Sequence, residues 1–201
     1  VSPLGRSEPQ IMFVSPSRTH ANLLRSAFGL ERISAIPNAV RPDWFSVRPR
    51  DPYKVIYASS PDRRLYHLLS MWPKIHAAEP KAHLHVYYEI DRWLALLDQL
   101  GPYGDPEMKD QGMLVRRYKA NPPLGLTFEG AIHPRKMVET FCSAGVLAYP
   151  CDTISFTEGF GTTVPQAHIA GMRVITPDTD AFGEIYGEGG PLELRGAEGE
   201  A

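Results

Sequence analysis

Hydrophobic positions along the chain fall into short runs of β-branched and aromatic residues, separated by stretches with helical spacing. Short apolar runs bounded by proline, glycine and charged residues predict β-strands. On this basis we predict strands at Ile11–Val14, Ile33–Ile36, Lys54–Ala58, Leu84–Tyr88, Leu126–Glu129, Val146–Tyr149, Arg173–Thr176 and, with a weaker pattern, Leu192–Leu194.

Apolar residues at helical spacing predict helices between these strands. One apolar face contains Leu65, Leu69 and Trp72, and Pro73 inside this run predicts a kink or a break. Gly104–Leu124 is the least regular stretch, and two interpretations stay open for it: a mobile loop, or a helix over Met108–Tyr118. The other predicted helices begin at Arg18, cover Trp93–Leu100 before Gly101-Pro102, open at Pro134 and close at Gly145, and cover Gly161–Ala170 before Gly171.

The regular alternation of strands and helices predicts an α/β fold with a parallel sheet and helices on both faces. Such sheets bind ligands beyond the carboxyl ends of their strands. Residues 37–52 are rich in proline and charge, so we interpret them as an interdomain linker. Residues 1–36 are then the remnant of a preceding domain, and 53–201 a second domain. The alternative is that 1–36 extend the same sheet.

Composition narrows the class of protein. The 201 residues are 43% hydrophobic and 22% charged, which is typical of a globular protein, and the formal net charge of -2 argues against a nucleic-acid partner. No apolar run is long enough to span a bilayer. Cys142 and Cys151 are not in a paired motif, so we expect reduced thiols in a cytoplasmic protein. Peripheral attachment of the intact protein to the inner membrane stays an alternative.

The stretch TEGFG places Glu158 between a predicted strand and a predicted helix. Gly159 and Gly161 allow close approach of the backbone and leave N–H groups that favour anions. A carboxylate beside them can accept hydrogen bonds from ligand hydroxyl groups. Backbone N–H groups that donate to phosphate, next to a carboxylate that accepts from hydroxyl groups, suit a sugar linked to a nucleotide diphosphate. The alternative is an acidic helix start with glycines for tight packing.

A second candidate loop, SSPDRR, follows the predicted strand Lys54–Ala58, with Pro61 near the first turn of the next helix. Arg63 and Arg64 are cations at a helix start, where the helix dipole disfavours them. A bound diphosphate would explain them. The alternative is a solvated arginine pair beside Asp62. Without GxGxxG after this strand, a nicotinamide or flavin fold is not indicated.

Three other patterns are weaker. The acidic pair in Asp178-Thr179-Asp180 resembles a metal-binding motif, but aspartate is common in such turns. His83 and His85 face the same side of a predicted strand, and no third zinc ligand lies nearby in the sequence. His168 on the helix after Gly161 is better explained by packing or exposure. We therefore expect no metal site.

Four ordered segments resemble the group 1 glycosyltransferases and cover most of the chain from Arg18 to about Leu194. They are IPNAV (36–40), SSPDRR (59–64), FEGAIHPRKMVETFCSAGVLAYPC (128–151) and TEGFGTTVPQAHIAG (157–171). The resemblance implies the GT-B fold, with two Rossmann-like domains, and sugar transfer from a nucleotide-diphosphate sugar with retention of configuration. It further implies that this chain is mainly the C-terminal, donor-binding domain, truncated at its C-terminus.

The resemblance also implies roles for particular residues. Glu158 matches the first Glu of the E-x7-E motif, and Arg63 matches a lysine that binds the diphosphate; we treat both as catalytic. Gln166 stands where the second Glu would bind the ribose, and an arginine usual before the lysine is absent. The glycine usual after IPN is Ala39. The expected donor-binding residues are Gly159, Phe160, Gly161, Thr162, Gln166, Ser59, Ser60 and, from the base-binding loop 130–133, Ile132 and His133.

The main hypothesis is therefore the donor domain of a metal-independent glycosyltransferase without a cofactor. A carbohydrate or lipid-linked acceptor would bind through the missing N-terminal domain, so the isolated chain should not transfer sugar. One alternative is a nucleotide-sugar epimerase of similar fold; a phosphorylase is disfavoured because no lysine motif for pyridoxal is present. Another is a degenerate, non-catalytic domain that binds a nucleotide sugar or a partner, as Gln166 and the missing arginine suggest.

Overall fold

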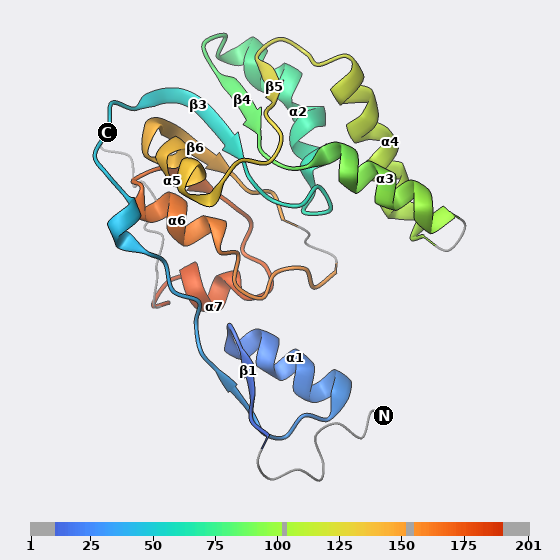
Figure 1. Ribbon diagram of the computed structural model, residues 1–201, viewed down its shortest axis with the longest axis vertical. Helices are drawn as coiled ribbons and strands as arrows, with labels where there is room; N and C mark the ends of the chain where they lie inside the picture. The colour runs from blue at the N-terminus through green and yellow to red at the C-terminus, as the bar shows by residue number, and fades with distance from the viewer. Residues whose placement is uncertain (1–10, 102–103, 152–154, 191–201) are drawn as a thin grey trace.

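Five short parallel strands form the main sheet of the computed structural model, which describes residues 11–101, 104–151 and 155–190 (Figure 1). The strand order is β5-β4-β3-β6-β7, and all four neighbouring pairs are parallel. The strands that follow β3 in the sequence, β4 and β5, therefore lie on one side of it, and β6 and β7 lie on the other side. The strands are β3 (Asp51–Tyr57), β4 (His83–Val86), β5 (Leu126–Phe128), β6 (Ala144–Ala148) and β7 (Arg173–Ile175).

Helices cover both faces of this sheet. Alternate residues of each strand point to opposite faces, so Ile56 and Leu147 join one apolar core while Tyr57 and Ala148 join the other. The first core contains residues of α5, α6 and α7, and the second contains residues of α2, α3 and α4. The helices are α2 (Leu65–Ala78), α3 (Ile90–Leu100), α4 (Pro106–Ala120), α5 (Pro134–Ser143), α6 (Thr163–Ile169) and α7 (Phe182–Tyr186).

The predicted α/β class, with a parallel sheet and helices on both faces, is confirmed. Each strand predicted within the described residues overlaps an observed strand. In β3, β4 and β6 the apolar run is buried between two helical layers. The weak strand Leu192–Leu194 lies outside the described residues.

Of the two outcomes predicted at Pro73, the break is wrong, because α2 continues to Ala78, and the kink stays a prediction. The side chain of Trp72 is fully buried, and its Nε1 donates to the carbonyl of Leu124 at 3.0 Å. Packing on both sides of the proline thus outweighs the one backbone hydrogen bond it cannot make. Gly145 does not close α5 but lies in β6, where a Cβ would come within 2.4 Å of the carbonyl oxygen of Pro52.

Of the two interpretations of Gly104–Leu124, the helix over Met108–Tyr118 is confirmed, since it lies within α4, which packs on α2 and α3. A turn after β3 needs correction. The helix after β3 starts at Leu65 rather than near Pro61. Arg64, at φ 60°, is in the left-handed region and separates the turn 61–64 from the helix.

The N-terminal residues form a separate small unit. β1 (Phe13–Ser15) and β2 (Ile33–Ala35) are parallel and form their own two-stranded sheet, with α1 (Arg18–Phe28) between them. Extension of the main sheet by this segment is therefore wrong. The chain then continues through a 3-10 turn (Pro42–Trp44) to β3, and Figure 1 shows the small unit lying beside α7. The assignment of this unit to an acceptor domain remains a prediction.

Within residues 11–101, 104–151 and 155–190, no helix has the length and apolarity needed to cross a bilayer.

Candidate functional site

The two candidate loops meet at the point in the sheet where the strand order reverses. β3 and β6 are adjacent in the sheet, while the strands that follow them lie on opposite sides. The loops after β3 and β6 therefore leave the same edge of the sheet and diverge. Open parallel sheets bind ligands at this kind of switch point. The structure brings Arg63, from the first loop, against Glu158, from the second.

Glu158 is buried and held from several directions. Its carboxylate Oε1 accepts a hydrogen bond from the hydroxyl of Tyr149 at 2.7 Å and from Nε of Arg63 at 2.7 Å. Its backbone N–H and that of Thr157 both donate to Oδ2 of Asp180, at 3.0 and 2.9 Å. Only 8% of the residue is exposed. The carboxylate is therefore fixed in place and partly satisfied by protein donors.

Arg63 lies in the tight turn 61–64, where its backbone N–H donates to the carbonyl of Ser60 at 2.9 Å. Its guanidinium pairs with the carboxylates of both Asp62 and Glu158. Burial lowers the pKa of Arg63, but the hydrogen bond to Glu158 and the charge of Asp62 outweigh it, and the net shift is upward. The cation is permanent, and it is shared by two internal anions.

Tyr149 connects the two loops. It follows β6, its hydroxyl lies 3.0 Å from Oγ of Ser59, and the same hydroxyl donates to Glu158. Burial, and then the nearby charge of Glu158, raise the pKa of Tyr149 far above its usual value, so it stays a neutral donor. The hydroxyl of Thr163, at the start of α6, donates to the carbonyl of Ala58 at the end of β3. Hydrogen bonds thus connect the segments that follow β3 and β6 across the switch point.

The glycines of the loop are required by packing. Gly161 has φ +66°, and a Cβ there would come within 2.5 Å of the ring of Phe182. At Gly159 a Cβ would lie 3.0 Å from Nδ1 of His20, from the N-terminal unit. These contacts favour the tight-packing role for the glycines. They do not exclude backbone N–H groups that face a ligand, because a hydrogen bond to the backbone does not use the Cβ position.

The other predicted donor-binding residues are spread around the same edge. Phe160 is buried, with its ring 6.2 Å from that of Tyr186, and its carbonyl accepts a hydrogen bond from the Tyr186 hydroxyl at 2.7 Å. Thr162 is exposed before α6, and Gln166 lies half-buried on α6. After β5, His133 caps α5: its Nδ1 accepts from the N–H of Arg135.

The remaining predicted donor-binding residues lie in the loops after β5 and β3. Ile132 is half-buried beside His133, which is exposed. Ser60 donates to Asp62 within the turn that carries Arg63. Their roles in donor binding stay predictions.

The N-terminal unit docks on this site through α1. Glu184 of α7 accepts hydrogen bonds from the N–H groups of Arg18 and Thr19, at 2.9 and 2.7 Å, and from the Thr19 hydroxyl at 2.8 Å. The ring of His20 stacks on Phe156, with centroids 5.5 Å apart. A carboxylate at a helix N-terminus is electrostatically favourable. Glu184 therefore joins the small unit to the main one directly beside the loop that carries Glu158.

Several of these residues were not identified from the sequence. Tyr149 and Glu184 gave no local signal, because their roles depend on partners brought close only by folding. Asp180 was considered only as a metal ligand. The structure instead uses Asp180, at φ 53°, to hold the backbone of Thr157 and Glu158.

No cluster suited to a metal ion occurs among the side chains that the structure describes. His168 is exposed on α6. Cys142 and Cys151 are both buried, free thiols, and burial raises the pKa of Cys151 to about 11, which disfavours the thiolate form.

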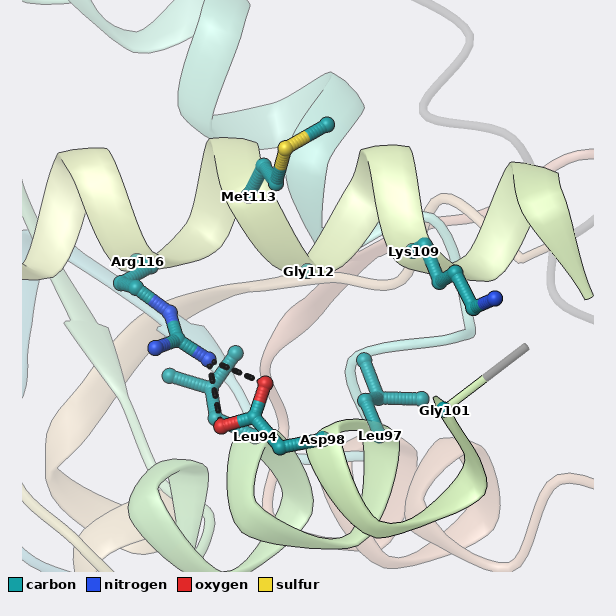
Figure 2. Close-up of a pocket in the computed structure, with 8 residues that line it drawn as sticks. All are labelled: Leu94, Leu97, Asp98, Gly101, Lys109, Gly112, Met113 and Arg116. Atoms are coloured by element: carbon teal, nitrogen blue, oxygen red, sulfur yellow. Dashed lines mark hydrogen bonds and ion pairs between the residues drawn. The ribbon is translucent and has the colours of Figure 1, made fainter. Parts of the chain in front are cut away.

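A groove of about 510 Å³ lies away from these loops, between α3 and α4 (Figure 2). Its floor is apolar. The helices approach closely at Gly112, where an added Cβ would come within 2.7 Å of Leu97. Arg116 bridges the helices through hydrogen bonds to both oxygens of Asp98, each at 3.0 Å. The groove is lined by none of the predicted site residues, so it is a competing location for a ligand.

Comparison with known proteins identifies the fold. No protein-family model and no curated protein matches the sequence itself. The structure, however, is similar to the pneumococcal O-GlcNAc transferase GtfA in complex with UDP and GlcNAc (TM-score 0.60, 16% identity, 94% of this chain and 35% of GtfA). It is also similar to sucrose-phosphate synthase from Thermosynechococcus elongatus (TM-score 0.59, 19% identity, 86% of this chain and 43% of the synthase).

A third similar structure is S. aureus TarM in complex with fondaparinux, alpha-GlcNAc-glycerol and UDP (TM-score 0.60, 14% identity, 84% of this chain and 30% of TarM). The chain therefore spans less than half the length of each of these proteins. At such low identity the similarity establishes the fold, which is that of part of a GT-B glycosyltransferase. The predicted resemblance is confirmed at that level.

Proposed function

We propose that this chain is the donor-binding part of a glycosyltransferase that uses a nucleotide-diphosphate sugar and retains the configuration of the transferred sugar. One observation carries the proposal: Arg63, Glu158 and Tyr149 converge from two loops at the switch point of the sheet. GtfA and TarM, which share the fold, were solved with UDP bound. In this proposal the acceptor is a carbohydrate or a lipid-linked molecule that binds through an N-terminal domain of the intact protein.

Arg63 is the residue that stabilises the leaving diphosphate. Negative charge develops on the diphosphate as the glycosidic bond breaks, and a fixed guanidinium in a partly buried site stabilises that charge strongly. The cation is already paired with Asp62 and Glu158, so a diphosphate must compete with those carboxylates. Release of Glu158 from Arg63 would free one acceptor position on Oε1, which also accepts from Tyr149, for a hydroxyl group of the sugar.

Tyr149 and Asp180 keep Glu158 in position during this exchange. The Tyr149 hydroxyl still donates to the carboxylate when Arg63 turns to the diphosphate, and Asp180 still holds the loop backbone. Gln166 on α6 would contact the ribose, with an amide in place of a carboxylate. The loop 130–133 would contact the base mainly through its backbone, because the His133 side chain already caps α5.

A second candidate function is a non-catalytic, partner-binding domain. The same ion pairs favour it: a guanidinium neutralised by two internal carboxylates forms a stable structural corner without any ligand. Gln166 in place of a second acidic residue points the same way. The two candidates differ in whether a nucleoside diphosphate binds at all.

Calorimetry separates the two. The chain is titrated with UDP, GDP and ADP, alone and sugar-linked, and with the matching monophosphates. We expect one diphosphate to bind more tightly than its monophosphate, because only the diphosphate reaches Arg63. The Arg63→Ala variant should bind that diphosphate about 10- to 100-fold more weakly, because it loses a charge-assisted hydrogen bond. Glu158→Ala should weaken binding of the sugar-linked form more than that of the free diphosphate.

Arg116→Ala is the matched control, because it also removes a paired arginine but from the groove between α3 and α4. It should bind nucleotides like the parent chain. Heat flow from none of the nucleotides would support the partner-binding candidate. Equal affinities for the parent chain and Arg63→Ala would reject the proposed site.

A further inference from the structure

Four titratable side chains form a continuous hydrogen-bonded chain on the sheet, apart from the candidate site. Nε2 of His83 lies 2.8 Å from Oδ2 of Asp51, Nδ1 of His83 lies 2.7 Å from Nε2 of His85, and Nδ1 of His85 lies 2.5 Å from Oε1 of Glu129. Asp51 begins β3, the histidines are in β4, and Glu129 follows β5. Leu84 between the histidines points into the core on the other face.

The number of protons in this chain is fixed by its contacts. A neutral imidazole carries one N–H, and an ionised carboxylate carries no donor. Three hydrogen bonds between two carboxylates and two imidazoles therefore need three N–H groups, which is one more than two neutral rings supply. Without that proton, His83 Nδ1 and His85 Nε2 would face each other with lone pairs at 2.7 Å, or one ring would lose its carboxylate.

The distance between the two facing nitrogens distinguishes a proton from a metal ion. Zinc binds imidazole nitrogen at 2.0–2.1 Å, so two nitrogens on one tetrahedral zinc are about 3.3 Å apart. The observed 2.7 Å is too short for that arrangement and suits a hydrogen bond between the nitrogens. No third ligand completes a metal cluster among the described residues, in agreement with this conclusion.

Several charged and titratable groups surround the two rings. Burial lowers the pKa of His85, against the opposing effect of its hydrogen bond to Glu129, and the charge of Lys54 on β3 lowers it further. The hydrogen bond from His83 lowers the pKa of Asp51, which therefore stays ionised beside that ring. Tyr87 stacks on His85, and burial and Glu129 raise the pKa of Tyr87.

We propose that His83 and His85 form a proton-binding site: the pair holds one proton more than two neutral rings, and the two rings share it between Nδ1 of His83 and Nε2 of His85 while each also donates to its carboxylate, Asp51 or Glu129. The shared proton ties the start of β3 to Glu129, the residue before the loop 130–133. When the proton leaves, one of the three hydrogen bonds is lost, and the side-chain link between β4 and that loop weakens. The consequence for nucleotide binding rests on the proposed function, in which the loop 130–133 contacts the base.

Nitrogen NMR of the imidazole rings tests the site directly, without a nucleotide. At about pH 6 we expect three protonated nitrogens on the two rings together, and scalar coupling between His83 Nδ1 and His85 Nε2. His85→Phe should abolish the coupling, whereas His168→Gln, which changes an exposed histidine, should preserve it. Two neutral rings, with or without a proton on Glu129 or Asp51, would overturn the assignment. So would signals that change when a chelator is added, since they would indicate a bound metal.

A second measurement tests the link to the loop. The dissociation constant of the nucleoside diphosphate that binds is measured below and above the pH at which the coupling disappears. We expect a change of about twofold or more in the parent chain and none in His85→Phe. A pH-independent constant with the coupling intact would reject the link but keep the proton site. Absence of any nucleotide binding would instead count against the proposed function.

Discussion

The two units of the chain are stabilised in different ways. The five-stranded unit has apolar cores on both faces of its sheet, and Trp72, Tyr57 and Phe141 are fully buried there. The β1–α1–β2 unit buries few apolar side chains of its own, Ala21 and Ile33, while Met12, Val14 and Phe28 are more than half exposed. Its main specific link to the larger unit is polar, through Glu184.

This difference has a consequence for the candidate site. A two-stranded sheet with one helix is marginally stable by itself, so the position of α1 depends on the contacts with α7 and with the loop of Glu158. The five-stranded unit needs no such support. We therefore expect the site residues of the switch point to remain in place when α1 detaches.

Removal of a core side chain should have the largest effect, and it should act on the larger unit. Trp72→Ala leaves a cavity under α2 and an unpaired Leu124 carbonyl, so the free energy of unfolding should fall by about 3–5 kcal/mol. Chemical denaturation with a sheet-sensitive signal measures this. Phe28→Ala, which truncates an exposed aromatic residue of the small unit, is the control and should cost far less. A similar loss for both variants would remove the distinction between the units.

Loss of the polar link should act on the small unit alone. Glu184→Gln replaces the carboxylate at the N-terminus of α1. The free energy that favours the docked position of α1 over the detached one should fall by about 1–2 kcal/mol. Hydrogen exchange should become faster in α1 and β1 and stay unchanged in β3 and β6. Glu188→Gln, an exposed change four residues later, should leave both unaltered. Faster exchange in β3 after Glu184→Gln would mean that the units are not independent.

Acid should release the same link reversibly. Burial raises the pKa of Glu184, but hydrogen bonds from Arg18 and Thr19 outweigh it, and the net shift is downward. A carboxyl with a lowered pKa in the closed state stabilises that state above its ordinary pKa and loses this effect as the pH falls through the lowered value. The protection factors of the α1 amides, which correct for the intrinsic pH dependence of exchange, should therefore fall below about pH 4.5. In Glu184→Gln, these protection factors should already be low and should not change in that range.

The smallest effect concerns the backbone of Arg64. At φ 60° a residue with a Cβ is strained by about 1 kcal/mol relative to glycine, but the Arg64 side chain also pairs with Glu107 of α4. Arg64→Ala loses the pairing and keeps the strain, whereas Arg64→Gly loses both. Denaturation should therefore find Arg64→Gly about 1 kcal/mol more stable than Arg64→Ala. Equal stabilities would mean that the turn relaxes when the arginine is removed.

The sequence was informative where a residue's role depends on its immediate neighbours. Apolar runs located the strands, and the combination of charge with glycine or proline after β3 and β6 located Arg63 and Glu158. It was not informative where roles depend on pairing across the fold. Arg63 and Glu158 were both expected to face a ligand, and nothing local indicated that they would pair with each other.

The same limit explains the other errors. Gly145 was taken for a helix end because only folding brings Pro52 against it. The helical part of Gly104–Leu124 was uncertain because α4 is stabilised by its packing on α2 and α3 rather than by a regular apolar stripe. His83 and His85 were recognised as facing one side, but their carboxylate partners lie on other strands.

The most direct test of the central claim is to locate a bound nucleoside diphosphate by backbone amide NMR. We predict that the largest chemical-shift changes fall in three segments that are distant in the sequence, 59–63, 130–133 and 158–163, and that Arg63→Ala removes them at the same ligand concentration. Changes confined to α3 and α4, around the groove at Arg116 and Asp98, would contradict the account.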